Sequence, residues 1–360
     1  MKHAYETTLT IDLKKLEHNY NYLKSLLNTN TEIIAVVKAF AYGHGDIKIC
    51  KKLESIGVKT FWVADFEEGV NLRKNNISSN IIVANPGNKS IEHIIKYKLD
   101  IVIHNHHLLN YYINSNKKIN AHIKFNTGMN RYGFDYKEIE DIAKKIKENS
   151  FLNIKSICSH LSSADDVNNI KFNLNQINNF KKVSSKFERL VKKKINKHLL
   201  NSHGVLNFSE YQFNQVRIGI GLYGGINNEN LSPIGKFNSV IAESRDISKG
   251  ESIGYSSSFV AKKSLNISVI PVGYADGLNR NFGNNIGRVL IDGKLCPIVG
   301  DISMDSFIAD TSEINCKVGD NVEIFGPKNS VLNLSKRINT IPYEIYSTLN
   351  RRIKRIYVDD

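Results

Sequence analysis

Short apolar segments alternate with longer amphipathic segments eight times over the first two-thirds of this chain. Each apolar segment has the length of a buried strand. The segments between them carry apolar residues at the i, i+3, i+4 spacing of a helix, as at Ile139, Ile142 and Ile146. Eight strand–helix units predict a parallel (β/α)8 TIM barrel, a fold that usually takes about 250 residues. The predicted strands are 32–39, 60–65, 80–85, 100–105, 120–126, 154–161, 197–202 and 215–222, and the predicted helices are 46–56, 66–75, 90–97, 106–115, 136–149, 167–194 and 204–211.

The pattern changes after about residue 230, where alternating apolar residues replace the helical spacing. An Asp-Gly pair at 292–293 marks a turn between two such segments. We therefore predict two domains, a barrel over 1–230 and a C-terminal mostly-β domain over 231–360. Residues 1–12 include a strand with no place in the barrel, which we expect to pair with the β domain. The predicted β strands are 267–272, 289–295, 297–302, 306–310, 321–325 and 353–358.

Reactive side chains recur where the predicted barrel strands end. In such barrels the loops after the strands converge on one mouth, where the chemistry takes place. A lysine that is desolvated there loses its proton more easily and becomes a nucleophile able to form a Schiff base. A lysine that merely extends its amino group to solvent is the alternative explanation. The strand-end residues are Lys38, Asn85, His104, Lys124, Asn126, His160, Asn201, Ser202 and Arg217.

Composition excludes several classes of protein. Hydrophobic residues make up 41% and charged residues 23%, which is ordinary for a globular protein. No apolar stretch approaches the roughly 20 residues of a membrane helix, and the start lacks the apolar core of a signal peptide, so we expect a cytoplasmic protein without membrane contact. Four scattered cysteines show no metal-ligand spacing, so we expect free thiols and no metal. The net charge of +14 is compatible with nucleic-acid binding, but the lysines are spread along amphipathic stretches, so we expect no such partner.

A GxGxxG match at 219–224 is a weak indication of dinucleotide binding. That fingerprint requires a helix directly after the first glycine turn, and the residues that follow here are poor helix formers. The closely spaced backbone N–H groups at the last barrel strand are better suited to hold a phosphate.

Nine segments in a fixed order resemble the alanine racemase family, pyridoxal-phosphate enzymes of fold type III. The resemblance spans nearly the whole chain and implies interconversion of L- and D-alanine, with D-alanine supplied for peptidoglycan. The matching segments are AVVKAFAYGHGD (35–46), HIKFNTGMNRYGF (122–134), SHLSSAD (159–165), NSHGVL (201–206), VRIGIGLYG (216–224), SIGYSSSF (252–259), VIPVGYADG (269–277), IVGDISMD (298–305) and YEIYSTLNRRIKR (343–355).

The resemblance implies that pyridoxal 5'-phosphate is held by Lys38 as a Schiff base. Arg217 would contact the pyridine nitrogen, with His160 beside it. A guanidinium does not give up its proton, so the ring would be a weaker electron sink and side reactions would be limited. The residues implied to bind the phosphate are Tyr42, Ser202, Gly219 and Ile220.

Racemisation removes the α-proton from one face and returns a proton to the other, which suits two bases. The resemblance implies Lys38 for one face and Tyr255 for the other. Tyr255 can act as this base if nearby cations such as His160 or Arg217 lower the pKa of its phenol. It also implies a homodimer in which each active site takes Tyr255 from the partner subunit. The residues implied to bind the substrate are Arg131, Met304 and Tyr274.

Several positions depart from the family pattern without removing a catalytic group. Lys124 aligns with a lysine that is carbamylated in some members, and we predict a carbamate or a chloride beside it. Arg351 stands at the position of a phosphate-binding tyrosine and could serve the phosphate as well. The departures are Phe40, Asn126, His203, Asp301 and Arg351.

Three other functions compete with this one. A decarboxylase of the same fold, or a racemase for serine or larger residues, would keep the cofactor, but a decarboxylase usually pairs the ring nitrogen with a carboxylate rather than with an arginine. A pyridoxal-phosphate carrier would lack residues 231–360 and Tyr255. A basic scaffold would leave the strand-end residues unexplained.

Overall fold

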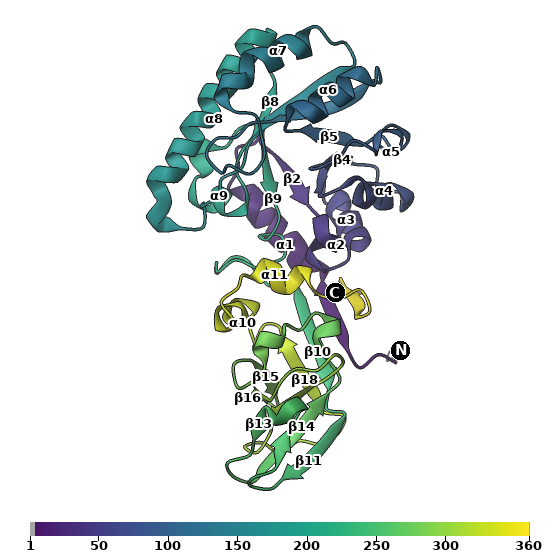
Figure 1. The fold of residues 1–360 in the computed structure, drawn as a ribbon, viewed down its shortest axis with the longest axis vertical. Coiled ribbons are helices and arrows are strands. Elements are labelled where there is room, and N and C mark those ends of the chain that lie inside the picture. Colours follow the sequence, from purple (N-terminus) through teal and green to yellow (C-terminus); the bar gives the residue numbers. More distant parts are fainter. Residues whose placement is uncertain (1–3, 360) are drawn as a thin grey trace. The chain divides into compact units, whose positions relative to one another are not determined.

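The computed structural model describes residues 4–359 and contains a closed barrel of eight parallel strands (Figure 1). Each strand pairs in parallel with the next, and β9 closes the barrel by pairing with β2. Most strand residues are buried on both sides, as in sheets covered by helices. The strands are β2 (Glu32–Val36), β3 (Thr60–Val63), β4 (Asn80–Val83), β5 (Asp100–Ile103), β6 (Ile119–Lys124), β7 (Leu152–Cys158), β8 (Asn196–His198) and β9 (Gln215–Ile218).

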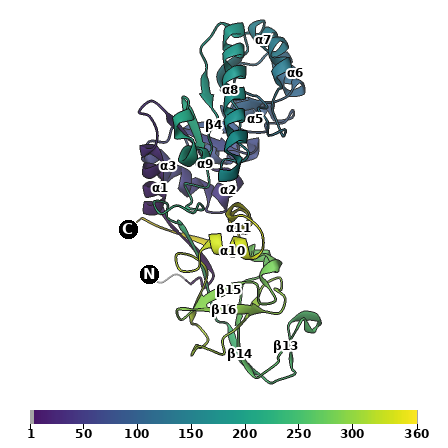
Figure 2. The same cartoon turned by 90° about the vertical axis from the view of Figure 1, so that its left-hand side faces the viewer.

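Helices cover the outside of the barrel. Two helices, α7 (Ile139–Lys147) and α8 (Ile170–Val191), lie side by side in both views (Figures 1 and 2). In α7 the residues Ile139, Ile142, Ala143 and Ile146 face inward and are buried, as the predicted spacing requires. The other helices of this region are α1 (Leu13–Ser25), α3 (Asp46–Ser55), α4 (Phe66–Lys74), α5 (Ile91–Lys96), α6 (His106–Asn114) and α9 (Ser202–Asn207).

The predicted fold, a barrel followed by a mostly-β region, is confirmed, but each of the eight barrel strands ends two to four residues before its predicted end. The strand predicted to run to 39 ends at Val36, so Lys38 begins the next element. The strand predicted to run to 202 ends at His198, because Asn201 caps α9 by accepting a hydrogen bond from the Gly204 N–H.

The segment after Lys38 forms a single left-handed turn, α2 (Lys38–Tyr42). Its four residues Ala39 to Tyr42 have φ angles of 52–57°, a conformation that costs an L-residue roughly 1–2 kcal/mol. Gly43 follows with φ +77°, and a Cβ there would lie 2.1 Å from the Tyr346 carbonyl oxygen. Arg355 holds the turn by donating to the Gly43 carbonyl at 3.1 and 2.9 Å.

A nine-stranded sheet in the order β11-β14-β17-β16-β15-β18-β10-β1-β19 organises the remaining chain. Strand β1 (Thr8–Asp12) pairs antiparallel with β10 and parallel with β19, so the opening strand lies inside this sheet. The predicted Asp-Gly turn joins β15 to β16, with φ of 45° at Asp292 and 76° at Gly293. The other elements are β10 (Gly235–Val240), β11 (Glu243–Ile247), β12 (Ser252–Ile253), β13 (Phe259–Val260), β14 (Leu265–Ile270), β15 (Arg288–Ile291), β16 (Lys294–Val299), β17 (Phe307–Asp310), β18 (Asn321–Phe325), α10 (Val331–Arg337), α11 (Pro342–Ser347) and β19 (Lys354–Val358).

The chain forms two compact units. Among the described residues, the barrel unit comprises 20–39 and 46–221, and the sheet unit comprises 4–19, 40–45 and 222–359. Residues 1–3, part of the segment predicted to pair with the β domain, lie outside the described residues. No helix within residues 4–359 combines the length and the apolar run that a bilayer crossing requires.

Candidate functional site

Arg217 of β9 lies inside the barrel, 6% exposed, with both terminal nitrogens engaged. Nη1 donates to Nδ1 of His198 and, at 3.2 Å, to the His198 carbonyl. Nη2 donates to the carbonyls of Ser159 and Leu199 and to Nδ1 of His160, the last two at 3.2 Å. The Nε–H has no hydrogen-bond partner among the described residues, so this donor remains for a ligand.

His160 is brought next to Arg217, as predicted, but it is not a cation. Burial, together with the charges of Arg217 and Lys124, holds the pKa of His160 well below its usual value. His160 is therefore not one of the cations expected to act on Tyr255. Arg217 is the cation of this pair.

Lys38 has a lowered pKa for several reasons. Desolvation of its amino group is the largest cause, the charge of Arg131 lowers the pKa further, and Arg217 adds to the effect. Glu68 opposes these causes. A lysine in such surroundings is neutral, and hence nucleophilic, at a lower pH than a lysine in water.

Lys124 at the end of β6 belongs to the same group of cations. Burial lowers the pKa of Lys124 to about 8, assisted by Arg217, Arg131 and Lys38. A cavity of about 10 Å³ beside it is lined by Lys124, Arg131, Tyr132, His160 and neighbouring backbone. Cations that depress one another's pKa values in this way form a site suited to anions.

Ser202, the first residue of α9, joins the loop after β9. Its Oγ accepts hydrogen bonds from the N–H groups of Gly219 at 3.0 Å and Gly221 at 3.2 Å. Its hydroxyl hydrogen is thus left to donate elsewhere. The Ile220 N–H between those glycines has no partner among the described residues, whereas the Gly219 N–H is occupied by Ser202.

Glu68 of α4 was not found by sequence reasoning. Its carboxylate accepts hydrogen bonds from the N–H groups of Ala39 at 2.6 Å and Ala64 at 2.7 Å. It therefore anchors the residue after Lys38 where the backbone enters its left-handed turn. The only signal in the sequence was the pair Glu67 and Glu68 in the first turn of α4. Acidic residues are common there because they interact favourably with the helix dipole, so the pair did not indicate a functional role.

Tyr42 belongs to the sheet unit and is buried. Its ring stacks on Tyr223 at 4.7 Å and lies 6.0 Å from Tyr343. Burial raises the pKa of Tyr42, so its hydroxyl stays protonated and can donate a hydrogen bond. Two departures from the family pattern also meet here, because the Arg351 guanidinium lies 4.6 Å from the Phe40 ring centroid.

Tyr255, Tyr274 and Met304 are exposed by 72%, 43% and 54% on neighbouring loops of the sheet unit. In the loop before β17, the Ser303 carbonyl accepts a hydrogen bond from the Tyr274 N–H, and the Met304 carbonyl accepts one from the Ala275 N–H. The loop carrying Tyr255 reaches the same segment, since Ser258 Oγ accepts from the Asp301 N–H at 3.3 Å. The structure thus gathers these three predicted residues on one surface.

Arg352 was also missed, although it joins two of these loops. Its guanidinium donates to both carboxylate oxygens of Asp276 at 2.7 and 2.9 Å and to Asp305 at 2.7 Å. Asp276 follows Tyr274 by two residues and Asp305 follows Met304 directly. The adjacent Arg351 drew attention in the sequence because of its position in a motif, not because of its contacts.

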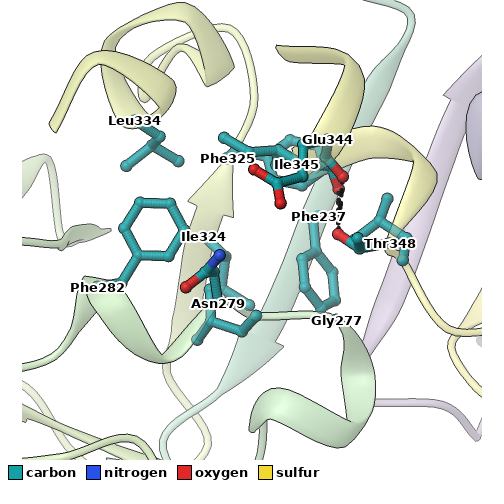
Figure 3. A pocket seen from close by; sticks show the side chains of 12 residues that line it. Phe237, Gly277, Asn279, Phe282, Ile324, Phe325, Leu334, Glu344, Ile345 and Thr348 are labelled. Carbon is teal, nitrogen blue, oxygen red and sulfur yellow. Dashed lines mark hydrogen bonds between the residues drawn. The ribbon is translucent and has the colours of Figure 1, made fainter. Parts of the chain in front are cut away.

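The sheet unit also holds an apolar cavity of about 20 Å³, lined by Phe237, Phe282, Ile324, Leu334 and Ile345 among others (Figure 3). The hydrogen bond drawn there joins Thr348 to the carbonyl of Glu344. Asn279, Glu344 and Thr348 also line it, but a cavity of this size holds only about one water, so it is a packing gap rather than a substrate site. Within the described residues there is also no group of three or more His, Cys, Asp or Glu side chains able to hold a metal.

A parallel barrel with a cationic mouth, followed by a mostly-β region, defines a two-domain class of barrel protein. Models of the N-terminal and C-terminal domains of alanine racemase match residues 11–227 and 234–357. The chain therefore belongs to the alanine racemase family, as its sequence motifs predicted.

Individual relatives agree with this assignment over their full length. The alanine racemase of Halothermothrix orenii is 34% identical, with 98% of this chain and 96% of the relative covered. A structure of alanine racemase from Bartonella henselae with covalently bound pyridoxal phosphate has a TM-score of 0.89 at 33% identity and covers 98% of this chain and 100% of its own. A Bacillus anthracis structure with bound L-Ala-P has a TM-score of 0.93 at 27% identity, covering 100% and 97%.

Proposed function

We propose that this protein binds pyridoxal 5'-phosphate and interconverts L- and D-alanine by a two-base mechanism, supplying D-alanine for peptidoglycan in the cytoplasm. The observation that carries the proposal is the cluster of Lys38, Lys124, Arg131 and Arg217 at the barrel mouth, whose charges lower the pKa values of both lysines. An anionic cofactor with an aldehyde matches a cationic site that contains a lysine of lowered pKa.

The residues present suit the parts of that cofactor. The Ser202 hydroxyl and the Ile220 N–H supply two donors for a phosphate. The family resemblance adds the hydroxyl of Tyr42. The Arg217 Nε–H supplies a donor for the ring nitrogen without transferring its proton. When bound, the cofactor supplies an electron-withdrawing ring that acidifies the α-proton of an amino acid attached to it.

The protein residues then divide the proton transfers between them. Nζ of Lys38 takes or returns a proton on one face of the α-carbon, and the phenol of Tyr255 from the partner subunit does so on the other. The 72% exposure of Tyr255 in one chain agrees with a role completed in a homodimer. Arg131 and the Met304 N–H bind the substrate carboxylate, and Tyr274 lines the entrance.

The test is conversion of L-alanine to D-alanine by the purified protein, followed by chiral chromatography. The chain has a single tryptophan, and Trp62 lies 5.3 Å from the Arg217 guanidinium. Cofactor added to cofactor-free protein should therefore quench the fluorescence of Trp62 as it binds beside Arg217. Quenching without turnover would retain the cofactor and redirect the search to serine and larger amino acids. No quenching would contradict the proposal.

We further expect Lys124 to carry a carbamate when carbon dioxide is present. With a pKa of about 8, roughly half of its amino groups are neutral at pH 8, and a neutral amine attacks carbon dioxide with loss of one proton. Protein in [13C]bicarbonate should show a carbamate 13C signal that is stronger at pH 8.5 than at pH 6.5 and absent in Lys124→Met. A signal that persists in Lys124→Met would assign the modification to another residue.

A further inference from the structure

The barrel interior carries a line of buried polar side chains where apolar packing would be usual. His122, Ser156 and His198 come from β6, β7 and β8 and are at most 4% exposed. Ser156 Oγ lies 2.6 Å from Nδ1 of His122 and 2.8 Å from Nε2 of His198. Nδ1 of His198 in turn faces Nη1 of Arg217.

Arginine fixes the direction of the hydrogen bonds that His198 makes. A guanidinium has only donors, so Nδ1 of His198 must accept and the ring must be neutral with its proton on Nε2. That proton is donated to Ser156, which leaves the Ser156 hydrogen free to be donated to Nδ1 of His122. The opposite direction would place two donors face to face between His198 and Arg217. Burial and the charge of Arg217 lower the pKa of His198 well below its usual value, in agreement with a neutral ring.

The line ends at a carboxylate. Nε2 of His122 has no hydrogen-bond partner among the described residues, but it lies 3.5 Å from Oδ2 of Asp100, close enough for electrostatic attraction. The other Asp100 oxygen accepts from Asn120 at 2.9 Å, and Asn120 accepts from Asn153 at 2.8 Å. Asp100 is the first residue of β5, whereas Arg217 is near the end of β9, so the line crosses the barrel.

Arg217 needs such support because it is a buried cation. No carboxylate of the described residues lies within 4.0 Å of its nitrogens, and carbonyls and neutral histidines provide its partners. A buried charge without an ion partner is held by oriented dipoles, and hydrogen bonds in a chain polarise one another.

We propose that Asp100, His122, Ser156 and His198 form a one-directional column that fixes the Arg217 guanidinium and so leaves its Nε–H available to a ligand. These are positioning residues, which act through Arg217 and do not touch the substrate. Their effect on catalysis rests on the role of Arg217 in the proposed function. The direction of the hydrogen bonds in the column is independent of that function.

The first test measures the tautomers directly. Full-length protein with its cofactor, labelled with [15N]histidine, should show both His122 and His198 as neutral rings protonated on Nε2. Spectra of His122→Asn and His198→Asn assign the two signals among the eleven histidines. A proton on Nδ1 of either ring would overturn the proposal, whether or not the protein racemises alanine.

The second test removes the distant carboxylate. Asp100→Asn keeps the shape of the side chain but not its charge, and we expect kcat to fall about tenfold with an unchanged KM for alanine. The 15N signals of the Arg217 Nη groups should broaden in the same variant as the guanidinium becomes freer to rotate. Broadening of the Arg217 signals would indicate a positioning role for Asp100, because a mere loss of stability would leave the guanidinium of the folded protein fixed.

Glu188→Gln is the matched control. Glu188 is a second buried carboxylate of the barrel unit, and it pairs with Lys197 at 2.8 Å and accepts from the Ile195 N–H outside the column. The Glu188→Gln variant should have a lower melting temperature but the same kcat and the same Arg217 15N signals as the unmutated protein. Equal kcat values for Asp100→Asn and Glu188→Gln would overturn the proposal. Absence of racemisation in the unmutated protein, with the expected tautomers present, would instead refute the proposed function alone.

Discussion

Lys38→Ala is expected to abolish both the lysine-bound chromophore and nearly all racemisation. The variant removes the only side chain proposed to bind the cofactor covalently and, with it, one of two proton-transfer groups, each of which contributes about 10²- to 10⁴-fold to rate. We expect a fall in kcat of at least about 10³-fold. The measurements are the absorption spectrum after exhaustive dialysis and the rate of D-alanine formation.

A matched control separates this loss from a general effect of removing a lysine. Lys48 lies on α3, outside the cluster at the barrel mouth, and Lys48→Ala should keep both the chromophore and the rate. If Lys38→Ala retains a chromophore that survives reduction by borohydride and remains attached to the chain, another lysine binds the cofactor and the assignment fails.

Tyr255→Phe is expected to lose about 10²- to 10⁴-fold of its racemisation rate in both directions. The reaction connects two mirror-image substrates, so the loss of one proton-transfer group slows both directions alike. Exchange of the α-proton with solvent behaves differently, because Lys38 still serves its own face. In D2O the variant should therefore exchange the α-proton of one enantiomer without converting it into the other.

This exchange experiment distinguishes two bases from one. With a single base serving both faces, Tyr255→Phe would exchange and racemise like the unmutated protein. Tyr136→Phe is the control, since Tyr136 is also an exposed tyrosine, at 52%, and has no proposed role in the proton transfers. Because the Tyr255 side chain is largely exposed in one chain, removal of its hydroxyl should leave the stability of the fold unchanged.

The barrel was predictable because its signals are local and repeated. The spacing of Ile139, Ile142 and Ile146 places three side chains on one buried face whatever the rest of the chain does. The left-handed turn was not predictable, because residues 39–42 have no glycine and ordinary side chains. Only their contacts in the folded chain, such as that of Ala39 with Glu68, stabilise it. Strand β11 was missed because it is largely exposed and lacks an apolar alternation.

The candidate site was predictable where a residue type carries the chemistry by itself. Lys38 and Arg217 stand at strand ends, and motif resemblance reinforced both. Glu68, His198 and Arg352 were not found, because each acts on another residue rather than on a ligand. In the sequence, nothing distinguishes His198 from other histidines near strand ends. Its role follows from its contact with Arg217, which depends on the closure of the barrel.

The left-handed turn after Lys38 has a consequence for chirality. Its strain arises because the Cβ of an L-residue crowds the following carbonyl at positive φ, and a residue of the opposite hand has no such conflict. In a chain assembled chemically, D-alanine at positions 39 and 41 would adopt these angles as readily as L-alanine adopts a right-handed helix. The backbone beside the proposed catalytic lysine thus favours, at two alanine positions, the enantiomer that the proposed reaction makes from L-alanine.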